Sequence, residues 1–222
     1  MSGERQDGRR GRALAALEDV DSSTRLRAAL HLGTYPDPDA VDVLVRRCGV
    51  EPDFFVRDML TWALTRQRPD DVVPKLLAEL QADAAQRRSQ ALHTLSKVGD
   101  PRGWDGITDL LLCDENDEVA RSAWRAAVVL APDGQRHDLA CTLTGQLGRG
   151  GRDIQLSLSR ALLGLGPIAE DLIATARNDA DPKVRAHAIA TEKLLRDPES
   201  DFVVAIQDAD RVINIGQNLP EG

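Results

Sequence analysis

Apolar residues recur along the chain in a pattern that predicts a repeated helical unit. An anchor residue, usually apolar and often beside an arginine, is followed four residues later by leucine or alanine. The instances are Leu26-Arg27 with Leu30, Val56-Arg57 with Leu60, Arg87-Arg88 with Ala91, Val119 with Ala123, Ile154 with Leu158, and Val184-Arg185 with Ala188. Successive anchors are 30, 31, 32, 35 and 30 residues apart. This nearly constant step predicts about six stacked repeats.

Each anchor lies at the start of a predicted helix. A side chain that can accept a hydrogen bond from the first free N–H groups precedes each anchor. These capping residues are Ser23, Asp53, Asp83, Asn116, Asp153 and Asp181. Shorter segments with apolar residues three and four positions apart lie between these helices, for example Val41, Leu44 and Val45. Each repeat is therefore predicted to contain two helices.

Three segments of the chain resemble HEAT repeats of the short bacterial type that is also found in phycobilin-lyase-like proteins. They are Asp71–Leu80, Asp181–Ile189 and Leu26–Gly33, and the resemblance extends over residues 13–197. It implies an all-α fold, an α-solenoid coiled as a right-handed superhelix of about six two-helix repeats, with the second helices on the concave side. Repeat five departs from the family pattern, because Gln155 replaces the usual arginine after a glycine-rich junction at 148–152. We expect a bend or hinge there.

The two ends of the chain lack the repeat. Residues 1–12 are polar and rich in glycine and arginine, so we expect a disordered N-terminus before the solenoid of residues 13–197. The register is lost in residues 198–222, where apolar groups alternate with charged ones. This segment either caps the last repeat, as a helix or strand, or forms a tail that occupies a groove of this chain or of a neighbour.

Composition narrows the class of protein. Aromatic residues make up 3% of the chain, so most of the 42% apolar fraction is leucine, alanine and valine, as expected for closely packed helices. The odd number of cysteines, Cys48, Cys113 and Cys141, predicts reduced thiols in the core of a cytoplasmic protein. No apolar run is long enough to span a bilayer, so no membrane partner is predicted.

Charge is distributed unevenly. The net charge of −8 argues against non-specific binding to nucleic acid, yet the six predicted second helices carry 15 Lys and Arg against 6 Asp and Glu. Large side chains with polar edges recur five and six positions after the anchors, where a helix places them in a row. We therefore predict a protein or peptide partner, acidic or helical in character, on the second-helix side. The predicted contact residues are Arg57, Trp62, Arg88, His93, Arg121, Trp124, Arg125 and Arg160.

Structural roles compete with this interpretation. The arginines after the anchors, Arg27, Arg57, Arg88 and Arg185, commonly pair with an acid of an adjacent repeat in this family. Trp62 and Trp124 could instead pack between repeats, and the four histidines could be isolated surface or boundary groups. Both sets of roles remain open from the sequence.

Signatures of catalysis are missing from the sequence. No pair of Cys or His residues has ligand spacing, so no metal site is predicted, and the glycine-rich junction lacks the spacing of a phosphate loop. Ser157 and Ser159 have no general base nearby in the sequence. We predict a non-enzymatic interaction module without a cofactor.

One enzymatic alternative remains. Some bacterial alkylpurine DNA glycosylases are built from similar repeats, and this resemblance would give roles to Trp104, Asp105 and Asp109 together with Trp62 or Trp124. Such an enzyme would need a continuous basic track for the DNA backbone, which the acidic composition argues against.

Overall fold

The computed structural model describes residues 2–197 and 202–217, and every regular element within these residues is a helix. The predicted all-α class and the two-helix repeats are therefore confirmed. The chain divides into two compact units, Met1–Ile107 and Thr108–Gly222, and we describe each unit by itself. No helix in the described residues is both long and apolar enough to cross a membrane.

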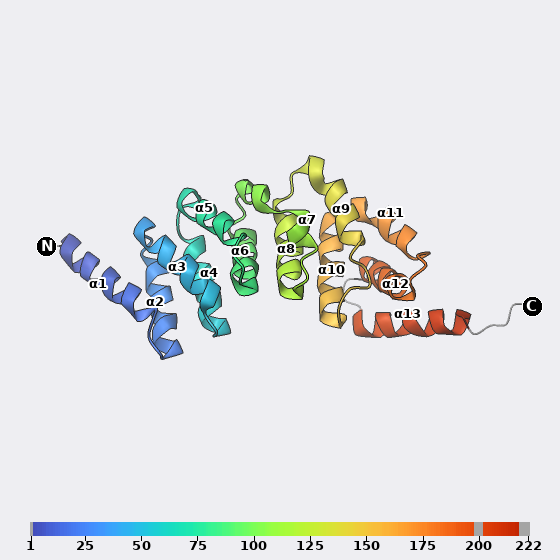
Figure 1. Ribbon diagram of the computed structural model, residues 1–222, viewed down its shortest axis with the longest axis horizontal. Helices are drawn as coiled ribbons and strands as arrows, with labels where there is room; N and C mark the ends of the chain where they lie inside the picture. Colours follow the sequence, from blue (N-terminus) through green and yellow to red (C-terminus); the bar gives the residue numbers. More distant parts are fainter. Residues whose placement is uncertain (1, 198–201, 218–222) are drawn as a thin grey trace, which may run out of the picture. The chain divides into compact units, whose positions relative to one another are not determined.

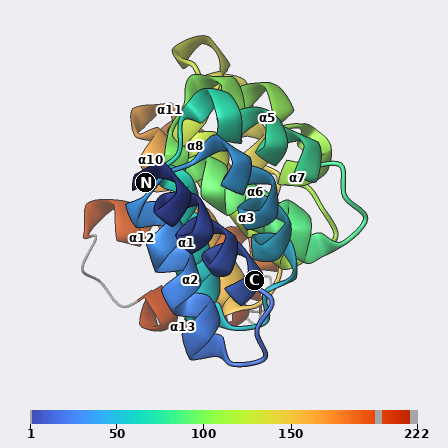
Figure 2. The same cartoon turned by 90° about the vertical axis from the view of Figure 1, so that its left-hand side faces the viewer.

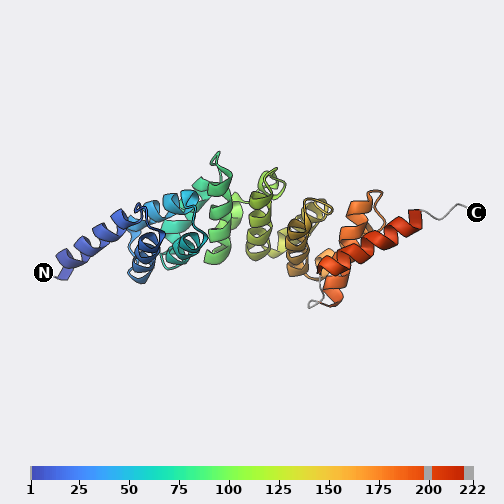
Figure 3. The same cartoon turned by 90° about the horizontal axis from the view of Figure 1, so that it is seen from below.

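The first unit consists of three helical hairpins (Figure 1). Its helices are α1 (Ser2–Ala16), α2 (Ser22–Thr34), α3 (Val41–Val50), α4 (Phe54–Thr65), α5 (Pro69–Glu79) and α6 (Ala85–Val98), with short 3-10 helices η1 (Pro38–Ala40) and η2 (Pro101–Gly106). The second helices of the hairpins pack in order, α2 against α4 and α4 against α6. In Figure 3 these hairpins follow one another from blue to green.

The second unit repeats the same arrangement and ends with an additional helix. It contains α7 (Asp109–Leu112), α8 (Asp117–Leu130), η3 (Asp133–Gln135), α9 (Arg136–Thr144), α10 (Arg152–Leu165), α11 (Pro167–Ala176), α12 (Pro182–Arg196) and α13 (Phe202–Gln217). The second helices α8, α10 and α12 again pack in order. Phe202, Ala205 and Ile206 of α13 pack against Ala190 and Leu194 of α12, which is the arrangement that the capping alternative describes.

Small apolar residues form much of the core in both units. Ala63, Leu60 and Leu64 are inaccessible to solvent in α4, as are Ala123 and Ala127 in α8. Alanine at such positions lets helix axes approach, and leucine fills the remaining space in a favourable helical rotamer. The repeated anchor pattern therefore predicts the buried stripe of α4, α8 and α10, where both the anchor and the residue four positions later are buried.

The caps of the second helices agree with the predictions at Asp53, Asn116 and Asp181, whose side chains accept bonds from the first turn. They differ in the other three repeats. Asp21 caps α2 in place of Ser23, and α6 and α10 begin after Ala84 and Gly151, without a side-chain cap. Positions in each second helix are therefore counted from its observed cap.

The N-terminal segment differs from the prediction. Residues 1–12 were expected to be disordered, but α1 covers most of this segment and packs against α2 (Figures 1 and 2). Ala13 and Leu17 are buried, and Arg10 forms ion pairs with Asp37 and Asp39. Contacts with the rest of the unit, which composition does not reveal, therefore stabilise a helix here.

Only one cysteine has the predicted core position. Cys48 is buried, and burial raises the pKa of its thiol to about 11, whereas Cys113 and Cys141 are exposed. Cys141 lies one helical turn from His137, with 3.8 Å between Sγ and Nε2. The prediction of three core thiols is therefore wrong for Cys113 and Cys141, because the short first helices α7 and α9 leave their later residues at the surface.

Candidate partner-binding face

A recurring arginine holds the turn between the two helices of a repeat. Arg57, four residues after the cap Asp53, donates from Nη1 to the carbonyl oxygens of Glu51 and Pro52, both at 2.8 Å. The same pair of bonds recurs in other repeats, at Arg25, Arg88 and Arg185. We call these four residues the turn arginines.

The bonds of the turn arginines differ from the roles that the sequence predicted for these residues. Arg57 and Arg88 were predicted to contact a partner, but both use a guanidinium nitrogen on their own turn. Arg57 donates to backbone carbonyls and forms no ion pair with an acid among the described residues, where the structural alternative had expected one from the adjacent repeat. In the first repeat the role belongs to Arg25 and not to Arg27, so the predicted register was two residues off there.

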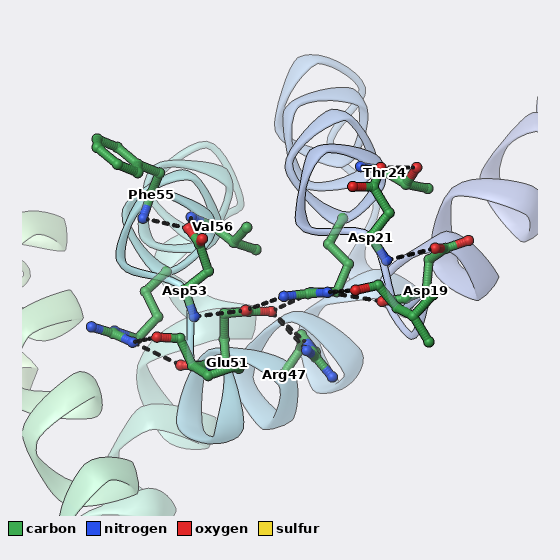
Figure 4. A network of polar contacts seen from close by, with 12 residues as sticks. Asp19, Asp21, Thr24, Arg47, Glu51, Asp53, Phe55 and Val56 are labelled. Atoms are coloured by element: carbon green, nitrogen blue, oxygen red, sulfur yellow. Dashed lines mark hydrogen bonds and ion pairs between the residues drawn. The ribbon is translucent and has the colours of Figure 1, made fainter.

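Arg25 has a second role, in a buried ionic network (Figure 4). Its Nε and Nη2 donate to the two carboxylate oxygens of Glu51 at 2.8 and 2.7 Å, and Arg47 donates to the same carboxylate at 2.7 Å. The amide of Asp53 adds a bond of 2.9 Å to Glu51, which is inaccessible to solvent. Burial alone would raise the pKa of Glu51, but these donors outweigh it and lower the pKa to about 2.

Counting from the caps shows which side chains form a row. The ninth residue after the cap is Leu30 in α2, Trp62 in α4 and His93 in α6. We call these three residues the anchor row. Leu30 is 46% exposed and Trp62 is 37% exposed, so both apolar side chains keep a solvent-accessible part on this side of the unit. Leu30 therefore begins the row on α2.

A glycine positions Trp62. A Cβ at Gly33 of α2 would lie 2.3 Å from Cζ3 of Trp62, so the indole ring packs directly over this glycine. The absence of a side chain lets the ring lie flat against α2 and keeps the rest of it at the surface. Trp62 is therefore held by packing before any partner arrives, which reduces the entropy lost when a partner binds.

Two exposed phenylalanines extend the apolar surface on α4. Phe54 and Phe55 follow the cap Asp53 and make an edge-to-face contact with ring centroids 5.6 Å apart. Phe55 is 71% exposed, lies seven residues before Trp62 and therefore belongs to the same side of α4. Figure 4 shows its ring directed away from the ionic network.

The sequence analysis missed Phe54 and Phe55, although a signal was present. Two of the three phenylalanines in the chain stand next to each other, just before the buried anchor Val56. A helix that buries Val56 and Leu60 cannot also bury both preceding positions, since successive residues point about 100° apart.

Cations surround these apolar groups. Arg27, Arg66 and Lys97 are exposed on α2, at the end of α4 and on α6, and none of them forms an ion pair within the part of the chain that the structure describes. Asp58 is the exposed acid on the same side of α4. We call the anchor row, Phe55 and these three cations the second-helix face of the first unit.

Trp124 in the second unit does not lie on a comparable face. It is inaccessible to solvent, and its Nε1 donates to the carbonyl oxygen of Leu112 at 2.8 Å. Trp124 stands eight residues after its cap and thus faces the turn before α8. The prediction that Trp124 contacts a partner is therefore wrong, because the side chain is buried. Trp124 packs within the second unit instead, as the structural alternative proposed.

An arginine from the following repeat completes the turn beneath Trp124. Ala120 occupies the position of the turn arginine in α8, and Arg149 substitutes for it by donating to the carbonyl of Asp114 and, at 2.9 Å, to the carboxylate of Asp117. The guanidinium of Arg149 also lies 5.9 Å from the ring centroid of Trp124. The glycine-rich junction places Arg149 at this turn. Gly148 and Gly150, on either side of it, have φ values of +84° and +67°, a conformation that favours glycine.

The remaining predicted residues of the second unit lie at or near its surface. Arg125 and Arg160 are the ninth residues after their caps and are exposed, whereas Arg121 is half-buried and forms an ion pair with Glu118 at 2.9 Å. The corresponding residue of α12 is Ala190, which α13 covers. Arg125 and Arg160 therefore occupy in the second unit the positions that Leu30, Trp62 and His93 occupy in the first.

His187 is buried within a polar chain in the second unit. Its Nδ1 accepts a bond of 3.0 Å from the amide of Gly148, so Nε2 carries the proton and faces Ser159 Oγ and the carbonyl of Gln155, each at 3.0 Å. Ser159 is 2.7 Å from Thr191 Oγ1, which donates to the carbonyl of His187. The sequence analysis had assigned no base near Ser159 and had treated the histidines as isolated groups.

This arrangement supports the fold and does not activate Ser159. A general base would accept the serine proton at Nε2, but this nitrogen donates, because the other ring nitrogen is occupied by Gly148. Both side chains are also inaccessible to solvent. Among the described residues no group of three or more His, Cys, Asp and Glu side chains is placed to hold a metal ion.

His187 makes stability depend on pH. Burial lowers its pKa from 6.5 to about 4, against the opposing effect of the Gln155 carbonyl. The fold therefore favours the neutral ring, and this contribution is complete above about pH 6.5 and is lost as the pH falls towards 4. Between about pH 7.5 and pH 5 we expect His187 to account for a loss of about 2 kcal/mol of unfolding free energy.

Urea unfolding of the wild type and of His187→Gln at both pH values measures this loss. Glutamine can still accept from Gly148 but does not titrate, so the variant should lose about 2 kcal/mol less than the wild type on acidification. Equal losses in the two proteins would contradict the prediction. Other acidic and histidine side chains titrate in both proteins and cancel in the comparison.

Known proteins resemble parts of this chain. The model of the HEAT repeats matches residues 12–96, which contain α2 to α5 and most of α6. Among solved structures, the complex of CpcE and CpcF of phycocyanin lyase from Nostoc sp. PCC7120 is similar, with 17% sequence identity over 90% of this chain and 93% of that chain and a TM-score of 0.49. No curated protein sequence matches the chain. The match to the family model identifies residues 12–96 as a segment of HEAT repeats, and the two-helix arrangement recurs in the rest of the described residues.

Proposed function

We propose that this chain is a non-enzymatic interaction module whose second-helix face binds an acidic polypeptide segment. The observation that carries the proposal is the anchor row, in which Trp62 is held by Gly33 yet remains partly exposed beside Leu30. Large aromatic side chains that are fixed before binding are the residues that most often dominate the energy of an interface. Stacked repeats also offer extended surfaces that suit a polypeptide partner.

The charge of the face supports an acidic partner. Arg27, Arg66 and Lys97 lie around the apolar groups, although the chain as a whole carries −8. Opposite charge on the partner would increase the rate of encounter and fix its direction, while burial of Trp62 and Leu30 would supply most of the affinity. His93 completes the row on α6. In the second unit, Arg125 and Arg160 are proposed as further contacts for acidic groups.

Replacing Trp62 with alanine tests the proposal. Peptides selected from a random display library on the wild-type protein should be rich in Asp and Glu and contain an apolar residue. We expect their affinity for Trp62→Ala to fall about tenfold or more, which corresponds to about 1.4 kcal/mol. Fluorescence anisotropy with labelled peptides measures this change.

Trp104→Ala is the matched control, because Trp104 is a half-buried tryptophan of the same unit that lies on η2 and not on the second-helix face. It should leave peptide affinity within about twofold of the wild type. Peptides that bind the wild type and Trp62→Ala equally would show that the anchor row is not the site. Tight, salt-sensitive binding of DNA at about 50 mM salt without any peptide binder would favour the nucleic-acid alternative instead.

A further inference from the structure

A groove with a basic rim runs between α1 and α2. It has a volume of about 300 Å³, its rim carries Arg9, Arg12, Arg27 and His31, and its floor includes Ala13 and Ala28. The small floor residues leave a shallow space between the two helices that is open to solvent, and the long side chains border it. Sequence analysis had assigned no site to α1, because that segment was expected to be disordered.

The arginines of this groove are not neutralised by the protein. Arg9 and Arg12 lie three residues apart on one side of α1 and form no ion pair with the described residues. Arg27 donates to Thr24 Oγ1 at 3.1 Å and likewise has no carboxylate partner there. Arg10 points to another side of the helix and does form ion pairs, with Asp37 and Asp39.

The acids nearest the groove are already occupied. The carboxylate of Asp21 accepts bonds from the amides of Ser23 and Thr24 and from Thr24 Oγ1, as the cap of α2. Asp37 is bound to Arg10 and accepts from the amide of Asp39. Three arginines therefore line this space, and none of the three forms an ion pair with a carboxylate of the described residues.

We infer that this groove binds carboxylate side chains of the acidic polypeptide segment, an inference that rests on the proposed function and adds a second place of contact. The planar guanidinium groups match carboxylates in a bidentate manner, and the alanine floor suits the aliphatic stems of glutamate. Arg27 and His31 flank Leu30 on α2, so the groove is continuous with the anchor row.

A polypeptide fits these features better than a nucleic acid does. A phosphate backbone requires a continuous basic track, whereas the basic residues of this groove are confined to α1 and α2. A space of about 300 Å³ holds a few side chains and not a duplex. The net charge of −8 also opposes a long polyanion more strongly than a short acidic segment.

The experiment uses the full chain and three labelled probes: a glutamate-rich peptide with alanine spacers, its glutamine counterpart, and a single-stranded oligonucleotide of the same charge. Fluorescence anisotropy at about 50 mM salt compares the wild type, Arg9→Gln/Arg12→Gln and Arg46→Gln. Arg46 is an exposed arginine of α3 outside the groove and serves as the matched control. Circular dichroism verifies that each variant is folded.

We expect the glutamate peptide to bind the wild type at least about tenfold more tightly than the double variant, and Arg46→Gln to stay within about twofold of the wild type. The glutamine peptide should bind no protein measurably. The inference is overturned if the double variant binds as well as the wild type, if the glutamine peptide binds equally, or if the oligonucleotide binds more tightly than the glutamate peptide.

The variant at the anchor row separates this inference from the proposed function. Loss of library-selected peptides from Trp62→Ala but not from Arg9→Gln/Arg12→Gln overturns the groove alone. Loss from the double variant but not from Trp62→Ala overturns the anchor row and supports the groove. Loss from both variants supports both.

Discussion

Replacing Glu51 with alanine is expected to lower the unfolding free energy of the first unit by about 3 kcal/mol. The carboxylate is inaccessible to solvent and receives bonds from Arg25, Arg47 and the amide of Asp53. Its removal leaves the buried guanidinium of Arg25 without a counter-ion and frees two donors at the turn. An uncompensated buried charge is more destabilising than the loss of the ion pair itself.

Asp42→Ala is the control for this prediction. Asp42 forms an ion pair with Lys75 at 3.0 Å, but both side chains are about half exposed, so the expected loss is below about 1 kcal/mol. Hydrogen exchange of peptides from α2 to α4, followed by mass spectrometry, reports stability in the first unit and not in the second. Similar losses in the two variants would mean that burial of Glu51 adds nothing to the pair.

The same network predicts an acid-sensitive first unit. Since the pKa of Glu51 is lowered from 4.5 to about 2, the stability that the ionised carboxylate contributes is complete above about pH 4.5 and is lost as the pH falls towards 2. The acid sensitivity that His187 confers begins at a higher pH and belongs to the second unit.

Periodicity predicted the fold because every repeat has to bury the same kind of stripe. Val56, Val119 and Ile154 are buried as expected and Val184 is half-buried, and a step of about thirty residues is long enough for two helices and two turns. The register was misassigned where another apolar residue stood near the start of a helix. In α2 the anchor was assigned to Leu26, although Arg25 holds the turn and Ala28 and Ala29 form the core.

Single-residue exposure could not be predicted from position alone. Trp124 and Arg125 are neighbours in the sequence, and a rotation of about 100° decides which of them faces solvent. The bonds that settle the choice come from Leu112 and Arg149, which lie on other elements of the second unit. The contact between Gly33 and Trp62 is likewise made between helices, so no local pattern indicates it.

Trp124→Ala is expected to lower the unfolding free energy of the second unit by about 3–5 kcal/mol, because it opens a cavity in a fully buried site. It also leaves the carbonyl of Leu112 without its donor. Trp124→Phe keeps most of the apolar contact and should lose about 1–3 kcal/mol, mainly from that unsatisfied carbonyl. Urea unfolding, together with hydrogen exchange in α7 and α8, measures both changes.

The two tryptophans should separate stability from binding. Trp62→Ala removes a partly exposed ring and is expected to weaken peptide binding while changing stability by no more than about 1–2 kcal/mol. Trp124→Phe should bind peptides like the wild type, since the ring never reaches the surface. If Trp124→Phe weakens binding and retains full stability, the indole takes part in recognition, and the prediction is contradicted.

Arg149→Met combined with Trp124→Ala tests whether these two side chains act as one unit that holds the turn before α8. If they do, the double variant should be no less stable than Trp124→Ala alone.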